Sequence, residues 1–313
     1  MMVDIKVGRT KPFDSLFDVQ VVGVVLTLNE IECRCNKRHS GRLRYTGYMS
    51  RENWAEQKLN HASWHCDNLE RHLDVWRGSG SISVVSKVSD DRLRLHLDLS
   101  VTETPPTEIW SLTAGDCVHN IRCSFDAWLW GKALEREVPL QNEKRIQFPF
   151  ADKPKEFSNN RDQLARDINA KVLDAIEEVQ PYRIDPNNGL RRCLELIRDL
   201  DNQNKHRFPA VTKVGVADVL AVGLSLEFDD DDSAQAEDPE AASEYYLPPL
   251  TNGGRLLTYS AKSPIKTGGQ VRYQLDLKPH IEFEGNDLPL IPQLRKLMDA
   301  AAKVLIWLES QVS

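Results

Sequence analysis

The chain has 313 residues, of which 41% are hydrophobic, and a formal net charge of −7. This length and composition are typical of one large globular domain or two ordinary ones, and no run of eighteen uncharged apolar residues predicts a transmembrane helix. The tract 229–244 holds eight acidic residues and no basic one, so the rest of the chain carries +1. The domain-wide basic surface of a nucleic-acid-binding protein is therefore absent, whereas a local basic site is compatible with these charges.

Residues 1–48 differ from the rest of the chain, because the basic stretch "CRCNKRHSGRLRYTG" has no clear periodicity. Cys33, Cys35 and His39 are of metal-ligand types, but their spacing matches no zinc pattern and a fourth ligand is missing. We therefore expect neither a metal nor a cofactor. Met49 directly precedes the first helical pattern, and we interpret 1–48 as an extension that is poorly ordered or not native.

The remainder, 49–313, is predicted to form a single α+β domain. No signal peptide is evident and the six cysteines show no disulfide framework, so we expect a cytoplasmic protein. Apolar residues at helical spacing predict a helical core, with helices over about 50–76, 106–136, 161–178, 187–205 and 289–311.

Strand patterns lie between these helices. Leu95, Leu97 and Leu99 alternate with polar residues, which predicts a β-hairpin over about 81–101. Two or more strands in 210–228 and others at 255–260 and 270–284 predict an antiparallel sheet over about 210–284. The acidic tract 229–244 is predicted to be a disordered loop.

Polar residues are unusually frequent in the apolar helix 106–136. On a helical wheel, His119, Arg122 and Asp126 form a stripe beside the apolar face, and Arg122 and Asp126 are spaced to pair. A third stripe mixes small, polar and aromatic residues, namely Asp116, Asn120, Cys123, Ala127 and Trp130. This composition indicates a helix that is contacted on most sides.

The helix 187–205 has the same feature at its end. Its period places Asp201 and Asn204 on the apolar face with Lys205 beside them, and His206 and Arg207 follow before a proline ends the helix. A buried carboxylate is costly without charged or hydrogen-bonded partners. The candidate partners of Asp201 are His119, Arg122, Lys205 and Arg207.

Two interpretations are open. In the structural one, a buried network fixes the packing of the two helices, and its members are Asn120, Arg122, Asp126, Asp201 and Asn204. In the functional one, basic residues converge on a pocket for an anion such as phosphate, and they are His119, Arg122, Lys205, His206 and Arg207. The two interpretations are compatible if carboxylates hold the basic residues in place.

The segments "GDCVHNIRCSFDAWLW", "IQFPF", "VQPY" and "LDNQNKHR" resemble a large family of uncharacterised bacterial proteins, over about residues 50–312. That resemblance implies no activity. A more distant resemblance is to HEPN helical domains, which occur in RNase toxins and abortive-infection proteins. Active members dimerise and carry an arginine followed four to six residues later by a histidine. Here that histidine position is Ala127, and Arg198 to His206 is too long a spacing.

We therefore expect a non-catalytic binding or scaffold protein with a polar network between two core helices. Its expected partners are a second copy of the chain and an RNA or other phosphate-bearing ligand, with no membrane. The alternative is a divergent HEPN-like, metal-independent RNase. In it, His119 or His206 would handle the 2′-hydroxyl proton, and Arg122 or Arg207 would stabilise the phosphate charge. Closed ion pairs with Asp126 and Asp201 favour a structural role. An open cleft lined by Arg122, Lys205 and His206 favours catalysis or phosphate binding.

Overall fold

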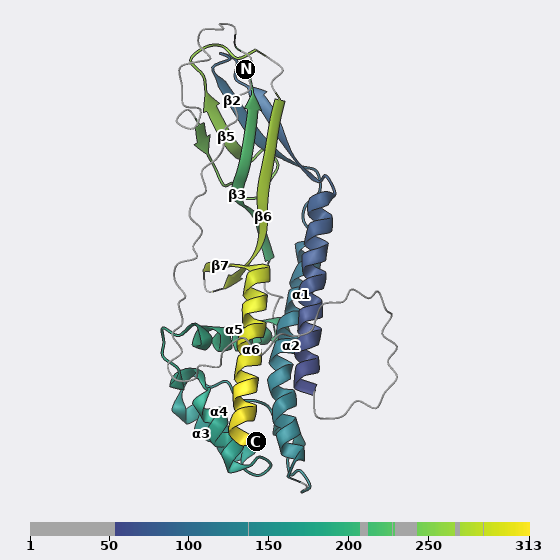
Figure 1. Ribbon diagram of the computed structural model, residues 1–313, viewed down its shortest axis with the longest axis vertical. Helices are drawn as coiled ribbons and strands as arrows, with labels where there is room; N and C mark the ends of the chain where they lie inside the picture. The colour runs from purple at the N-terminus through teal and green to yellow at the C-terminus, as the bar shows by residue number, and fades with distance from the viewer. Residues whose placement is uncertain are drawn as a thin grey trace, which may run out of the picture.

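A computed structural model describes residues 54–136, 138–206, 212–226, 228, 243–266, 270–283 and 285–313. Within these residues the chain forms six α-helices, one four-stranded and one three-stranded antiparallel sheet (Figure 1). The predicted α+β class is confirmed. The extension 1–48, the interpretation of Met49 and the tract 229–242 lie outside the described residues.

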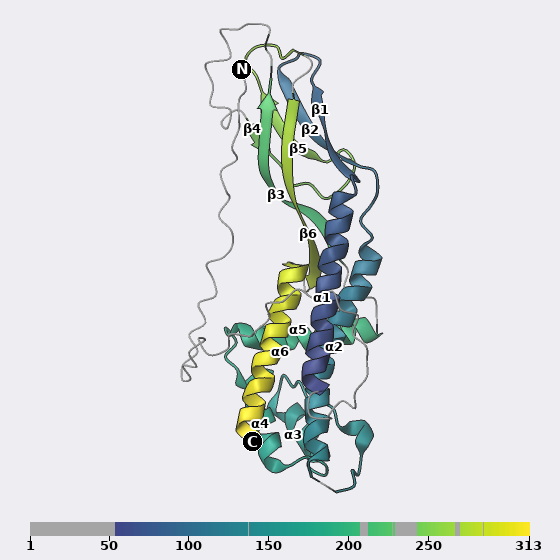
Figure 2. The ribbon, with the colours of Figure 1, turned by 45° about the vertical axis from the view of Figure 1, so that its right-hand side comes forward.

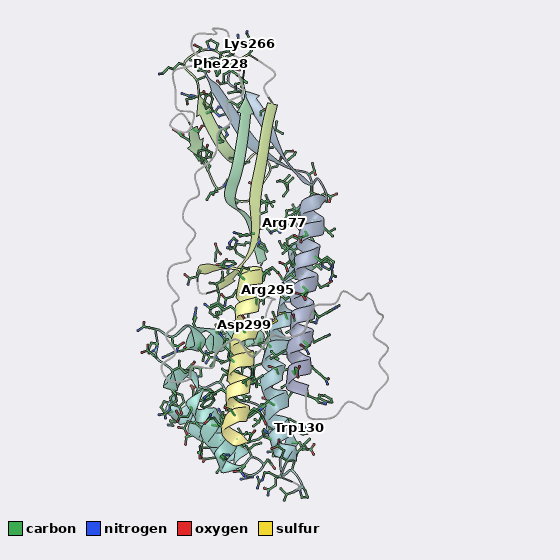
Figure 3. All side chains as sticks on the ribbon, viewed as in Figure 1. Arg77, Trp130, Phe228, Lys266, Arg295 and Asp299 are labelled. Carbon is green, nitrogen blue, oxygen red and sulfur yellow. The ribbon has the colours of Figure 1, made fainter. Side chains whose placement is uncertain are left out.

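Three long helices form the main helical layer and lie side by side in both ribbon views (Figures 1 and 2). They are α1 (Trp54–Gly78), α2 (Thr107–Leu134) and α6 (Leu290–Val312). Each buries the apolar stripe that its sequence predicts, for example Leu69 in α1 and Leu297 in α6. Arg295 of α6 pairs with Asp67 and Glu70 of α1 at 3.1 and 2.6 Å, and Figure 3 shows it between the two helices.

Three shorter helices pack against this layer: α3 (Pro154–Leu164), α4 (Ala170–Glu178) and α5 (Gly189–His206). The single helix expected over 161–178 is wrong. Asp167, 2% exposed, accepts hydrogen bonds from the backbone N–H groups of Gln141 and Asn142, and this holds the intervening residues in a loop. Asn169 then caps α4 by accepting from the N–H of Lys171 at 3.0 Å.

The predicted hairpin is present as β1 (Ile82–Val88) and β2 (Arg94–Val101). The hairpin was expected apart from the later sheet, but it shares one sheet with two of the later strands. β5 (Arg255–Ser260) pairs with β2, and β4 (Ser243–Tyr245) pairs with β5, in the order β1-β2-β5-β4. Pairing places Leu97 opposite Leu257, both buried, and the last two residues expected in the disordered loop lie in β4.

The second sheet has the order β3-β6-β7. β3 (Thr212–Ser225) is one long strand where two or more were expected, and it pairs with β6 (Gln270–Phe283). β7 (Asn286–Pro289) pairs with the end of β6 and leads directly into α6. Both sheets lie at one end of the helical layer, where Arg77 of α1 donates to the carbonyl of Leu277 in β6 (Figure 3).

No helix in the described ranges is long and apolar enough to span a membrane.

The helix α5 runs across the main layer (Figures 1 and 2). Its residue Asn204 lies beside Gly115 of α2. A Cβ atom at Gly115 would lie 2.3 Å from the Oδ1 and 2.7 Å from the Cγ of Asn204. Contacts this short do not occur between real side chains, so the absence of a side chain at Gly115 leaves room for the amide of Asn204 to lie against α2.

We expect Gly115→Ala to reduce the free energy of unfolding by about 2 kcal/mol, because the added methyl group overpacks the α2–α5 contact. Urea denaturation measures this change. Gly131→Ala on the same helix is the matched control, since nothing lies within 4 Å of its Cβ position and alanine favours helix formation. Adding Asn204→Ala should restore most of the loss. Wild-type stability in Gly115→Ala alone would contradict the close approach.

Candidate functional site

The first polar cluster, Arg122 and Asp126 of α2, holds an extended segment of backbone, residues 146–151, that lies in no strand. Arg122 donates to Asp126 at 2.8 Å and to the carbonyl of Phe148 at 2.7 Å. Asp126 accepts from the N–H of Phe148 at 2.7 Å. The two side chains thus satisfy both backbone groups of one buried residue, as a neighbouring strand would. The Arg122 guanidinium also lies 4.8 Å from the ring centre of Phe150.

This segment and the residue after it are held by two further side chains, Gln180 of the motif "VQPY" and Arg198 of α5. Gln180, which is fully buried, accepts from the N–H of Ala151 at 2.8 Å and donates to the carbonyl of Ile176 at 2.9 Å. Arg198 of α5 pairs with Asp152 at 2.5 Å. Polar residues from α2, from the end of α4 and from α5 therefore converge on one extended stretch of chain.

The second polar cluster surrounds Asp201, whose side chain is only 2% exposed. His119 Nδ1 lies 2.9 Å from Asp201 Oδ1, and Lys205 Nζ lies 2.7 Å from Oδ2. The side chains of His119 and Lys205 are 42% and 41% exposed, respectively. The buried carboxylate of α5 therefore holds two cationic side chains that both reach solvent.

Hydrogen bonding fixes the charge of this second cluster. The hydrogen bond with Asp201, with a smaller contribution from Cys123, raises the pKa of His119 to about 9. Burial opposes ionisation of Asp201, but the hydrogen bonds from His119 and Lys205 outweigh it and lower the pKa of that carboxyl group. At neutral pH the cluster holds an imidazolium, an ammonium and a carboxylate, and it carries one net positive charge.

Cys123 is a member of this cluster that the sequence reasoning missed. Its Sγ lies 3.3 Å from His119 Nε2, and the residue is half-buried. The sequence placed Cys123 on the third stripe without a role. The available signal was the spacing, because residues four apart on a helix are neighbours.

The single network expected from the sequence is therefore two clusters. Arg122 is a partner of Asp126 and Phe148 and not of Asp201, and its side chain is only 13% exposed. Asn120, although buried, donates to the backbone carbonyl of Asp116 at 2.9 Å, and the Asp116 side chain is exposed.

Three other predicted residues have different outcomes. Asn204 lies at the α2–α5 contact beside Gly115. The side chain of His206 and the whole of Arg207 lie outside the description, so their roles stay predictions.

Among the side chains that the structure describes, no group of three or more histidine, cysteine, aspartate or glutamate residues is arranged to hold a metal ion. Comparisons of the chain with protein-family models, curated proteins and solved structures found no match. The resemblances noted from the sequence motifs stay expectations, and the site is interpreted from its own geometry.

We expect Asp126→Ala to lower the free energy of unfolding by about 3 kcal/mol, because it removes the carboxylate partner of the largely buried Arg122 guanidinium and the acceptor of the Phe148 N–H. Chemical denaturation measures the loss. Asp174→Ala is the control, since Asp174 pairs with Arg161 at 2.6 Å but is 66% exposed, and it should cost under about 1 kcal/mol. Equal losses in the two variants would argue against a structural role for Asp126.

The raised pKa of His119 predicts a pH dependence of stability. The folded protein binds this proton more tightly than the unfolded chain, so the stabilisation is complete below the ordinary pKa of 6.5. It is lost as the pH rises through about 9. The stability difference between wild type and His119→Gln, measured by urea denaturation, should shrink across this interval. A difference that is constant with pH would show that His119 does not act through its charge.

Proposed function

We propose that this protein is a non-catalytic binding protein that takes a phosphate-bearing ligand at His119 and Lys205. The observation that carries the proposal is the pair of half-exposed cationic side chains on the buried carboxylate of Asp201. Asp201 neutralises one of the two positive charges and orients both groups, and one positive charge is left over. An arrangement held in place in this way is suited to bind an anion at the surface.

The hydrogen bonds already present indicate how a phosphate would bind. Lys205 uses one of its three N–H donors on Asp201 Oδ2, which leaves two for a ligand. His119 Nε2 faces the sulfur of Cys123 at 3.3 Å, and sulfur is a weak acceptor. A phosphate oxygen is a stronger acceptor for this charged N–H group and would replace the sulfur.

The Arg122 contacts favour binding over the alternative, RNA cleavage. A metal-independent RNase would need a cation facing the transferring phosphate. Arg122 is occupied by Asp126, by the carbonyl of Phe148 and by the ring of Phe150. His119 could still move a proton, but its partner in that reaction would have to be Lys205 or Arg207.

A fluorescent single-stranded RNA, titrated at several salt concentrations, tests the proposal by fluorescence anisotropy. Lys205→Gln should weaken binding about tenfold, as expected for one lost charge-assisted hydrogen bond. It should also reduce the slope of log affinity against log salt by about one. Lys155→Gln, an exposed lysine on α3, is the matched control and should change neither quantity.

Inorganic phosphate as a competitor shows whether the phosphate group alone is recognised. Affinity unchanged by both Lys205→Gln and His119→Gln would overturn the proposed site. RNA cleavage in EDTA that His119→Gln abolishes would establish the RNase instead. The homodimer expected from the sequence stays a prediction, which light scattering of the same samples measures.

A further inference from the structure

One turn of α2 supplies a thiol and an imidazole, and α5 adds a buried carboxylate, so that the three groups form a continuous chain. Cys123 Sγ lies 3.3 Å from His119 Nε2, and His119 Nδ1 lies 2.9 Å from Asp201 Oδ1. This is the order of groups that activates a nucleophile: the nucleophile contacts a base, and a third group orients that base.

The surroundings fix this chain of groups. Asp201 is held from its other oxygen by Lys205 at 2.7 Å, and it lies one turn before Asn204, whose side chain packs over Gly115 of α2. The carboxylate therefore sets both the orientation of the His119 ring and the nitrogen that keeps a proton. A protonated imidazole beside a sulfur atom stabilises the thiolate, which is the reactive form of cysteine.

Cys123 also differs in access from the other cysteines that the structure describes. Cys66, Cys117 and Cys193 are buried, and burial raises the pKa of each of these thiols. Cys123 is half-buried and lies beside a half-exposed histidine. Of these four, it is therefore the thiol that a reagent in solution can approach.

We propose that Cys123, His119 and Asp201 form a nucleophilic thiol site that reacts with small disulfides. The proposal goes beyond ligand binding and does not depend on it. The reactive form of this site is the pair in which His119 Nε2 holds the thiol proton and the sulfur is a thiolate.

The reaction is a thiol–disulfide exchange. The thiolate attacks one sulfur of the disulfide, a new S–S bond forms to Cys123, and the original S–S bond breaks with its electron pair on the departing sulfur. His119 Nε2 then gives its proton to that leaving thiolate. Cys123 is oxidised to a mixed disulfide, one half of the reagent is reduced to a free thiol, and the carboxylate of Asp201 is unchanged.

The charges of the cluster support this step. His119 and Lys205 carry two positive charges, and Asp201 supplies only one negative charge. A thiolate at Cys123 supplies the second and makes the cluster neutral. An anion bound from solution would supply it as well, so inorganic phosphate should slow the reaction of Cys123 if the site also binds phosphate.

The test treats the full-length protein with oxidised glutathione at neutral pH and follows each cysteine by peptide mass spectrometry. We expect Cys123 to be modified at least about tenfold faster than the three buried cysteines and about tenfold faster than in His119→Gln, because an unassisted thiol is mostly protonated at this pH. Mapping by peptide also separates Cys123 from Cys33 and Cys35. His72→Gln, an exposed histidine on α1, is the matched control and should leave the rate unchanged.

A spectroscopic measurement separates activation from mere exposure. The ultraviolet absorbance of the thiolate should be present in the wild type at neutral pH and reduced in both Cys123→Ser and His119→Gln. Circular dichroism shows whether His119→Gln folds. If it does not, two measurements decide instead: the relative reaction rates of the cysteines within the wild type, and the difference in absorbance between the wild type and Cys123→Ser. The proposal would be overturned, whether or not RNA binds, if Cys123 reacted no faster than the thiol of reduced glutathione under the same conditions and showed no thiolate absorbance.

Discussion

The extended segment that contains Phe148 and Ala151 is buried against the helices without a strand partner, so its backbone polar groups depend on side chains. Asp126 and Arg122 serve the two groups of Phe148, and Gln180 serves the N–H of Ala151. An unsatisfied backbone group at these positions would cost about as much as a lost buried hydrogen bond. This requirement joins α2 and the end of α4 to the same stretch of chain, and it commits Arg122 to a structural role.

A second requirement arises where α5 crosses α2. Gly115 leaves room for the Asn204 side chain, and Asp201, one turn earlier on α5, lies in an interior where a lone carboxylate would be unstable. His119 and Lys205 satisfy it from the surface side. Because two cations meet one anion there, the structural solution leaves a positive charge at the surface. Both proposals use that charge, one for a phosphate from solution and the other for the thiolate of Cys123.

Much of this arrangement was predictable from local patterns. The helical period gave the positions of α1, α2, α5 and α6 to within a few residues and placed Asp201 on the apolar face of α5. The alternating leucines predicted the hairpin β1–β2. The break between α3 and α4 was missed. Asn169, a residue type that commonly caps a helix, was its local signal, whereas the contacts of Asp167 with backbone groups some twenty-five residues away have no local signal. The pairing of β5 with β2 was not predictable either, because it joins residues 160 positions apart, such as Leu97 and Leu257.

The sequence by itself determined which polar side chains face inward, because residue spacing on a helix is a local property that neighbours along the chain specify. Only the tertiary structure decided the partner of each one. His119 meets Asp201 across 82 positions, and Arg122, which the sequence left open between a buried network and an anion pocket, binds Asp126 and the carbonyl of Phe148. Such pairings depend on where α5 crosses α2 and on the path of an irregular segment. Neither is set by periodicity, so the separation into a structural cluster and a surface cluster appears only in three dimensions.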